Sequence, residues 1–261
     1  MMTNNTDIEI KKKNGICLLT LNKPEVRNAL GVELRITLTE LFKEIDKDDS
    51  IKVVILTGNG PVFSAGGDLT TLREQRLIEG RKRILTGHEL IRLMLKLEKP
   101  IIAAVNGPAA GAGMSLALAC DFIIASERAS FISSFSKVAL VPDLGSAFFL
   151  SQILGPYFAK KIMMTGEPIT AQKAFELQMV NEVVAEEQLM KTAYSFAEQL
   201  ACGPGISNGL TKMLVNRSMY GNLDDVLEYE AFSQAMCFET QDFIEGVDAF
   251  FNKRPAKFQG K

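Results

Sequence analysis

The sequence lacks tryptophan altogether, has a single histidine, and contains no long uninterrupted run of apolar residues. No stretch approaches the roughly eighteen apolar residues of a membrane-spanning helix, so no transmembrane segment is predicted. The four cysteines stand at no metal-ligand spacing, and each lies in an apolar stretch: Cys17, Cys120, Cys202 and Cys237. We therefore expect buried free thiols in a reducing compartment, and neither a disulfide framework nor a metal site.

Neither sign of charge dominates the chain. It has 29 Lys and Arg against 31 Asp and Glu, for a net charge of −2 over 261 residues. A composition of 47% hydrophobic and 23% charged residues is normal for a soluble globular protein with a sizeable core. The missing basic excess argues against nucleic-acid and acidic-membrane partners. The polar N-terminus carries no signal region and the C-terminal KFQGK is no peroxisomal address, so we expect a cytoplasmic protein.

Strand-like and helical patterns alternate through the first 184 residues. Strand-like runs cover 15–21, 51–58, 100–107 and 121–126, and helical patterns cover 31–50, 71–99 and 109–120. The second helical pattern is expected to be interrupted near Gly80 and Gly87. Such alternation favours an α/β domain with a largely parallel sheet. Because only helical patterns follow, we expect a core domain over 1–199 and a C-terminal helical subdomain over 200–261.

Two loops rich in small residues follow buried strands and lead into helices, NGPVFSAGGDL (59–69) and NGPAAGAG (106–113). Small residues let a ligand approach the backbone, and the free N–H groups of a helix's first turn favour negative charge. Two such N–H groups converging on one point would form an oxyanion hole. Ordinary turns between strands and helices would also place glycines here. Neither loop matches a dinucleotide or phosphate-loop fingerprint.

Asp143 is the single acid in the oily run LVPDLGSAFF (140–149). An unpaired carboxylate in such surroundings is costly unless its pKa shifts or the group has a function. One interpretation is an N-cap for the helix that follows, and the other is a desolvated general base. Apolar neighbours are expected to raise its pKa: Phe135, Leu140, Val141, Leu144, Phe148 and Phe149.

The chain resembles the crotonase (enoyl-CoA hydratase/isomerase) superfamily nearly from end to end. The matching motifs are NKPEVRNAL, VVILTGNGPVFSAGGDL, KPIIAAVNGPAAGAGMSLALACDFIIAS, MTGEPITAQ and EGVDAFFNKRPAKF. The resemblance implies a core of stacked ββα turns and a C-terminal helical region that trimerises, giving a homotrimer or a dimer of trimers. It also implies an acyl-CoA thioester substrate. Coenzyme A would arrive with the substrate, so no separate cofactor or metal is expected.

The resemblance assigns roles to individual residues. The thioester oxygen would accept hydrogen bonds from the backbone N–H groups of Gly67 and Ala112. Phe250 and Lys253 match positions that reach coenzyme A, often across a subunit boundary. Further residues would line the path of coenzyme A: Arg27, Ala29, Ala65, Gly66, Asp68 and Leu69.

The two glutamates of a hydratase are missing from this sequence. By position they fall on Ser115 and Phe135. A serine cannot serve as a general base near neutral pH without an activating partner, and a phenylalanine cannot serve at all, so hydration is disfavoured. The second absence also weakens a dienoyl-CoA isomerase. An aspartate in a PDxG context, as at Asp143, resembles the base of isomerase branches. We therefore expect an enoyl-CoA isomerase of fatty-acid or lipid metabolism, acting on a 3-enoyl-CoA or on a ring epoxide of phenylacetyl-CoA.

Other functions remain open at this point. The chain could be a hydratase-like enzyme of weak or different activity, or a non-catalytic acyl-CoA-binding protein. A serine hydrolase would use Ser115 as nucleophile and His88 as base, although the sequence has no G-x-S-x-G elbow. A dehalogenase of this fold needs a tryptophan, and the charge balance gives no support for RNA binding. A basic run could meet coenzyme A phosphates or form a solvated helix face: Arg73, Arg76, Arg81, Lys82 and Arg83.

Overall fold

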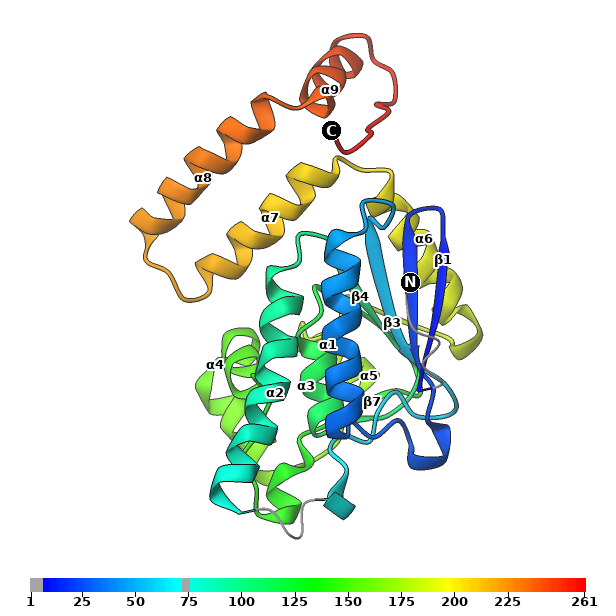
Figure 1. The fold of residues 1–261 in the computed structure, drawn as a ribbon, viewed down its shortest axis with the longest axis vertical. Coiled ribbons are helices and arrows are strands. Elements are labelled where there is room, and N and C mark those ends of the chain that lie inside the picture. The colour runs from blue at the N-terminus through cyan, green and yellow to red at the C-terminus, as the bar shows by residue number, and fades with distance from the viewer. Residues whose placement is uncertain (1–6, 72–75) are drawn as a thin grey trace.

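The computed structural model describes residues 7–71 and 76–261, and a six-stranded sheet forms its centre (Figure 1). Within this six-stranded sheet only β1 and β2 pair antiparallel, and the other neighbouring strands are parallel, which confirms the α/β prediction. In sheet order the strands are β1 (Ile8–Lys13), β2 (Ile16–Leu21), β3 (Val53–Gly58), β4 (Ile101–Val105), β6 (Phe122–Ser126) and β9 (Glu182–Val184). A small second sheet contains β5 (Ala109–Ala110), β7 (Ser130–Ile132) and β8 (Ile169–Thr170).

The central strands are apolar because both faces of the sheet are covered. Along β3, Val54 and Leu56 point into one hydrophobic cluster, and Val53 and Ile55 point into another. Helices α1 (Val32–Lys47) and α2 (Leu77–Lys96) pack side by side over the first face. Helix α6 (Leu189–Ala201) covers the second face. Side chains that alternate between two buried faces explain why these strands read as continuous hydrophobic runs.

Helix α2 runs through both of its glycines, so the predicted interruption near Gly80 and Gly87 is wrong. A Cβ atom on Gly87 would lie only 2.4 Å from Cδ2 of Leu144 and 2.9 Å from Nη1 of Arg35. Gly87 therefore marks a close approach between α2, α1 and the loop before α4, and not a helix end.

The remaining elements surround this core and extend from it. They are α3 (Ala112–Leu118), α4 (Ser146–Thr165), α5 (Ala171–Glu176), α7 (Gly205–Ser218), α8 (Leu223–Phe238), α9 (Gln241–Phe251), and the 3-10 helices η1 (Pro24–Val26), η2 (Leu69–Thr71), η3 (Ser134–Val138) and η4 (Glu186–Gln188). Helices α8 and α9 extend beyond the top of the sheet in Figure 1. The proposed boundary between residues 199 and 200 falls in the last turn of α6 and stays a prediction.

The cysteines only partly follow the expectation. Cys17 and Cys120 are buried, whereas Cys202 is exposed and Cys237 is half-buried, so the prediction that all four are buried is wrong. Burial raises the pKa of Cys17 to about 11. Cys202 and Cys237 lie in the C-terminal region, where helix faces remain open to solvent. Within residues 7–71 and 76–261, no helix is long and apolar enough to span a bilayer.

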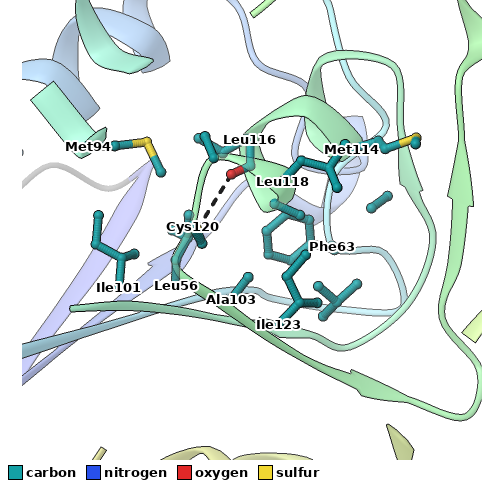
Figure 2. Packing of buried hydrophobic residues seen from close by; sticks show 14 of the residues in the cluster. Leu56, Phe63, Met94, Ile101, Ala103, Met114, Leu116, Leu118, Cys120 and Ile123 are labelled. Carbon is teal, nitrogen blue, oxygen red and sulfur yellow. Dashed lines mark hydrogen bonds between the residues drawn. The ribbon is translucent and has the colours of Figure 1, made fainter. Parts of the chain in front are cut away.

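Helix α3 begins close to a neighbouring loop because its first two residues are small, and its larger residues point into the core. Figure 2 shows Met114, Leu116 and Leu118 of this helix among the side chains of Phe63 and other core residues. A Cβ atom on Gly113 would lie 2.5 Å from the backbone oxygen of Ser64, which is closer than packed atoms allow. The absence of that Cβ lets α3 begin directly against the loop that follows β3.

We predict that Gly113→Ala destabilises the fold by about 1–3 kcal/mol, because overpacking against backbone outweighs the gain in helix propensity. Gly31→Ala is the matched control, since a Cβ there meets nothing within 4 Å and φ is −63°. Thermal and urea unfolding of both variants measure the difference. Equal stability of the two variants would contradict the tight packing described for α3.

Candidate active site

Three loops meet at the carboxyl ends of β2, β3 and β4. The backbone N–H of Ala65 donates to the oxygen of Arg27 at 2.9 Å. The N–H of Leu30 donates to the oxygen of Gly66 at 2.6 Å. Carboxyl ends of parallel strands lie at one edge of a sheet, which is where ligands bind in open α/β folds. The loop at residues 27–30 is therefore fastened to the loop that follows β3.

The loop after β4 joins the same cluster. Its Ala110 N–H donates to the oxygen of Ser64 at 2.9 Å. Gly66 has φ +92°, and a Cβ there would lie 2.5 Å from Ala110 O and 3.1 Å from Ala112 N. Ala112 is the first residue of α3, where helix geometry leaves the N–H without an intrahelical partner. The structure thus brings the two glycine-rich loops into contact, while the oxyanion roles of Gly67 and Ala112 stay predictions.

Asp143 does not cap α4. The helix begins at Ser146, its N-cap is Gly145 with φ +80°, and no side chain caps it. The backbone oxygen of Asp143 accepts a hydrogen bond from Ser146 N at 3.1 Å, but its carboxylate takes no part. The N-cap interpretation is therefore wrong, and the carboxylate needs another explanation.

Asp143 is not a lone acid, because Arg35 of α1 forms an ion pair with it. Nη2 of Arg35 lies 3.6 Å from Oδ2 of Asp143, and the two side chains are 2% and 15% exposed. Oδ1 of Asp143 is buried without a hydrogen-bond partner in the described part of the chain. Sequence reasoning missed Arg35. The helical spacing did indicate that this arginine is buried. Arg35 stands three residues before Leu38 and seven before Phe42, which places it on the buried face of α1.

Burial raises the pKa of Asp143 above its ordinary value. The positive charge of Arg35 opposes that rise most strongly, followed by Arg83 and His88. The neighbours expected to cause the burial contribute unequally, because Leu144 is fully buried whereas Leu140 and Val141 are 48% and 81% exposed. Removal from water thus dominates, and the pKa moves in the direction that suits a general base.

The two positions that lack hydratase glutamates are both buried. Ser115 is fully buried, and its hydroxyl donates to the backbone oxygen of Gly111 at 3.2 Å, one turn back in the chain. Within the described residues no hydrogen bond joins this hydroxyl to His88, which is half-buried on α2. Phe135 is buried, and its ring edge lies 3.8 Å from where a Cβ of Gly111 would be. The second loop therefore faces an apolar wall at the position of the missing acid.

The residues predicted to contact coenzyme A divide into two groups. Arg27, Ala29, Ala65 and Gly66 lie within the joined loops, and Asp68 and Leu69 follow directly, where the Asp68 carboxylate accepts from Thr70 N at 3.0 Å. The hydroxyl of Thr70 donates to the same carboxylate at 2.6 Å, and this hydrogen bond, followed by the backbone one, lowers the pKa of Asp68. Phe250 and Lys253 are instead exposed at the end of α9, on a part of the chain that Figure 1 shows away from the start of α1. One copy of the chain does not bring the two groups together.

The basic run is only partly a solvated helix face. Arg76, Arg81 and Lys82 are exposed, but Arg83 is buried and donates to Oγ1 of Thr71 at 2.9 Å. Arg73 lies outside the described residues. Within 7–71 and 76–261, no group of three His, Cys, Asp or Glu side chains could hold a metal ion.

Comparisons with known proteins match this architecture. The family model for enoyl-CoA hydratase/isomerase matches residues 11–261. The chain is 38% identical to 1,2-epoxyphenylacetyl-CoA isomerase of Escherichia coli K12, covering 95% of this chain and 97% of that relative. It is 35% identical to short-chain-enoyl-CoA hydratase of Clostridium acetobutylicum, covering 95% of each.

Solved structures agree with the fold. An enoyl-CoA hydratase subunit I from Geobacillus kaustophilus superposes with a TM-score of 0.95 at 30% identity, over 99% of this chain and 100% of the other. The expected crotonase fold is confirmed, whereas trimerisation stays a prediction. On the strength of the family model and these relatives, the chain belongs to the enoyl-CoA hydratase/isomerase (crotonase) family of enzymes.

Proposed function

We propose that this enzyme is an acyl-CoA isomerase that moves a double bond by a 1,3-proton transfer. The observation that carries the proposal is Asp143, a half-buried carboxylate with one oxygen paired and the other without a partner in the described residues. Both hydratase glutamates are absent, which leaves this acid to do the proton chemistry. A single carboxylate suffices, because the proton that leaves one carbon of the acyl group returns to another.

The mechanism follows from the roles assigned to the two loops and the acid. Asp143 removes a proton from the carbon next to the thioester of a 3-enoyl-CoA. The electron pair moves into a dienolate whose oxygen accepts hydrogen bonds from the N–H groups of Gly67 and Ala112. Asp143 then returns the proton two carbons further along, which gives the 2-enoyl-CoA. Coenzyme A is carried by the substrate and lies along the joined loops.

Two acyl groups remain in consideration. One is a straight 3-enoyl chain, and the other is the ring epoxide of phenylacetyl-CoA. The second is favoured by the 38% identical relative named as an isomerase of that compound. A hydratase-like activity remains an alternative, because the 35% identical relative carries a hydratase name. A non-catalytic acyl-CoA-binding protein is the other alternative. We place the isomerase in cytoplasmic fatty-acid or aromatic-acid breakdown.

A homo-oligomer is also proposed, in the form of a trimer or a dimer of trimers. Helices α8 and α9 carry exposed large apolar side chains that a monomer would leave in water. They include Phe232, Met236, Ile244, Phe250 and Phe251. Burial of this surface in a neighbouring copy could also bring Phe250 and Lys253 to that copy's loops.

Asp143→Asn is expected to lower kcat for isomerisation by about 10²–10⁴-fold, because the amide cannot accept the proton. Steady-state assays with 3-enoyl-CoA and with the ring epoxide thioester measure the loss, and 2-enoyl-CoA plus water tests hydration. Asp49→Asn, at an exposed position, is the control and should be unchanged. An active Asp143→Asn enzyme, or strong hydration by the native protein, would reject the isomerase.

The rate of isomerisation is expected to rise with pH through the raised pKa of Asp143. Only the ionised form accepts a proton. Burial raises the pH at which Asp143 ionises above that of a free aspartate, whose pKa is about 3.9. The range of low pH over which the rate rises is the acid limb of the pH profile. The pH dependence of kcat/KM measures the acid limb for the free enzyme. An acid limb whose apparent pKa is at or below that of a free aspartate would contradict the assignment of Asp143 as the base.

The mass in solution tests the oligomer. Light scattering coupled to size exclusion should give three or six times 28.7 kDa. Phe251→Glu, at an exposed position of α9, should lower that mass because a charge disfavours a buried apolar contact. Glu228→Gln is a control on α8. A native protein that runs as a monomer at every concentration would refute the assembly.

A further inference from the structure

We propose that Arg35 is a positioning residue for the isomerisation: its guanidinium holds Oδ2 of Asp143 and so fixes the direction of the carboxylate that takes and returns the proton. This inference rests on the proposed function and deepens it. Four observations carry it: the anchor of the guanidinium, the space around it, the single contact with the carboxylate, and the charges nearby.

The guanidinium of Arg35 is anchored to the backbone that supports the first glycine-rich loop. Its Nε donates to the oxygen of Leu30 at 3.1 Å. The N–H of that same Leu30 donates to the oxygen of Gly66 at 2.6 Å. One residue therefore links the guanidinium to the loop that carries Gly67. Nη2 of Arg35 lies 4.0 Å from where a Cβ of Gly67 would be, so the side chain reaches that loop directly.

Helix α2 confines the guanidinium from the other side. A Cβ on Gly87 would lie 2.9 Å from Nη1 of Arg35 and 2.4 Å from Cδ2 of Leu144, the residue after Asp143. The glycine thus lets α2 close over both the arginine and the loop that carries the acid. With Arg35 only 1% exposed, the side chain has little room to adopt another position.

The contact between the two charges engages only one carboxylate oxygen. Nη2 lies 3.6 Å from Oδ2, while Oδ1 and Nη1 are buried without hydrogen-bond partners in the described residues. A bidentate pair would occupy both oxygens and fix the charge on the carboxylate. A single contact orients the group and leaves the second oxygen without a hydrogen bond.

The charges that act on Asp143 come from two helices. Arg35 of α1 is the nearest, and Arg83 and His88 of α2 act in the same direction. The guanidinium therefore opposes the rise in the pKa of Asp143 that removal from water causes. Removing Arg35 should raise the pKa of Asp143 further, and the acid limb of the rate should move to higher pH.

The test compares Arg35→Met and Arg35→Lys with the native enzyme, and uses Arg92→Met, at an exposed position of α2, as the control. Arg35→Met should lower kcat by about 100-fold through a misplaced base, with little change in KM, and should move the acid limb to higher pH. Arg35→Lys keeps the charge and should leave the limb near its native position. Its kcat should still fall, since an ammonium cannot reproduce the fork that spans Leu30 and Asp143.

Thermal unfolding and calorimetric binding of an acyl-CoA product accompany the kinetics. A purely structural role would lower stability and activity together without moving the acid limb, and that result would overturn the proposal. Native kcat in Arg35→Lys would overturn it as well. Should Arg35→Met fail to fold, the kcat of Arg35→Lys decides. If Asp143→Asn is inactive while both Arg35 variants behave as native, the positioning role of Arg35 is wrong but the isomerase proposal stands. If Asp143→Asn is active, the isomerase proposal itself is wrong.

Discussion

The ion pair between Arg35 and Asp143 is the constraint around which the site is arranged. Removing two opposite charges from water costs several kcal/mol each unless good geometry and further hydrogen bonds compensate. Here the compensation is incomplete, because one nitrogen and one oxygen of the pair are buried without partners. Such a pair contributes little to stability by itself. It persists because α1, α2 and the loop before α4 hold it from three sides.

That enclosure depends on residues without side chains. Gly87 admits Leu144 and the guanidinium, and Gly66 and Gly113 admit the backbone of the neighbouring loops. Each of these positions would collide with another part of the chain if it carried a Cβ. The small residues at these positions are therefore needed for the close approach of one backbone segment to another. The packing of these glycines therefore lets the core close around the ion pair.

The sequence predicted most of the sheet but not the partner of the acid. Strands such as Val53–Gly58 are recognisable because both faces are buried, so nearly every residue is apolar. Strand Ile8–Lys13 was missed because its outer positions are lysine and glutamate, at the edge of the sheet. Periodicity shows which face of a helix is buried, but not what that face meets. Arg35 and Asp143 are 108 positions apart, and only tertiary packing brings them together.

Isomerase and hydratase relatives match this chain at similar identity, so the fold and the two glycine-rich loops do not separate the two reactions. The difference must lie in the groups that handle protons and water. Hydration needs polar groups that bind and activate a water molecule, whereas a proton shift within the acyl group needs one base and benefits from excluding water. Phe135 and Ser115, one apolar and one engaged in its own helix, leave no second base at the two expected positions. A site with one desolvated carboxylate and an apolar wall therefore fits internal proton transfer better than the addition of water.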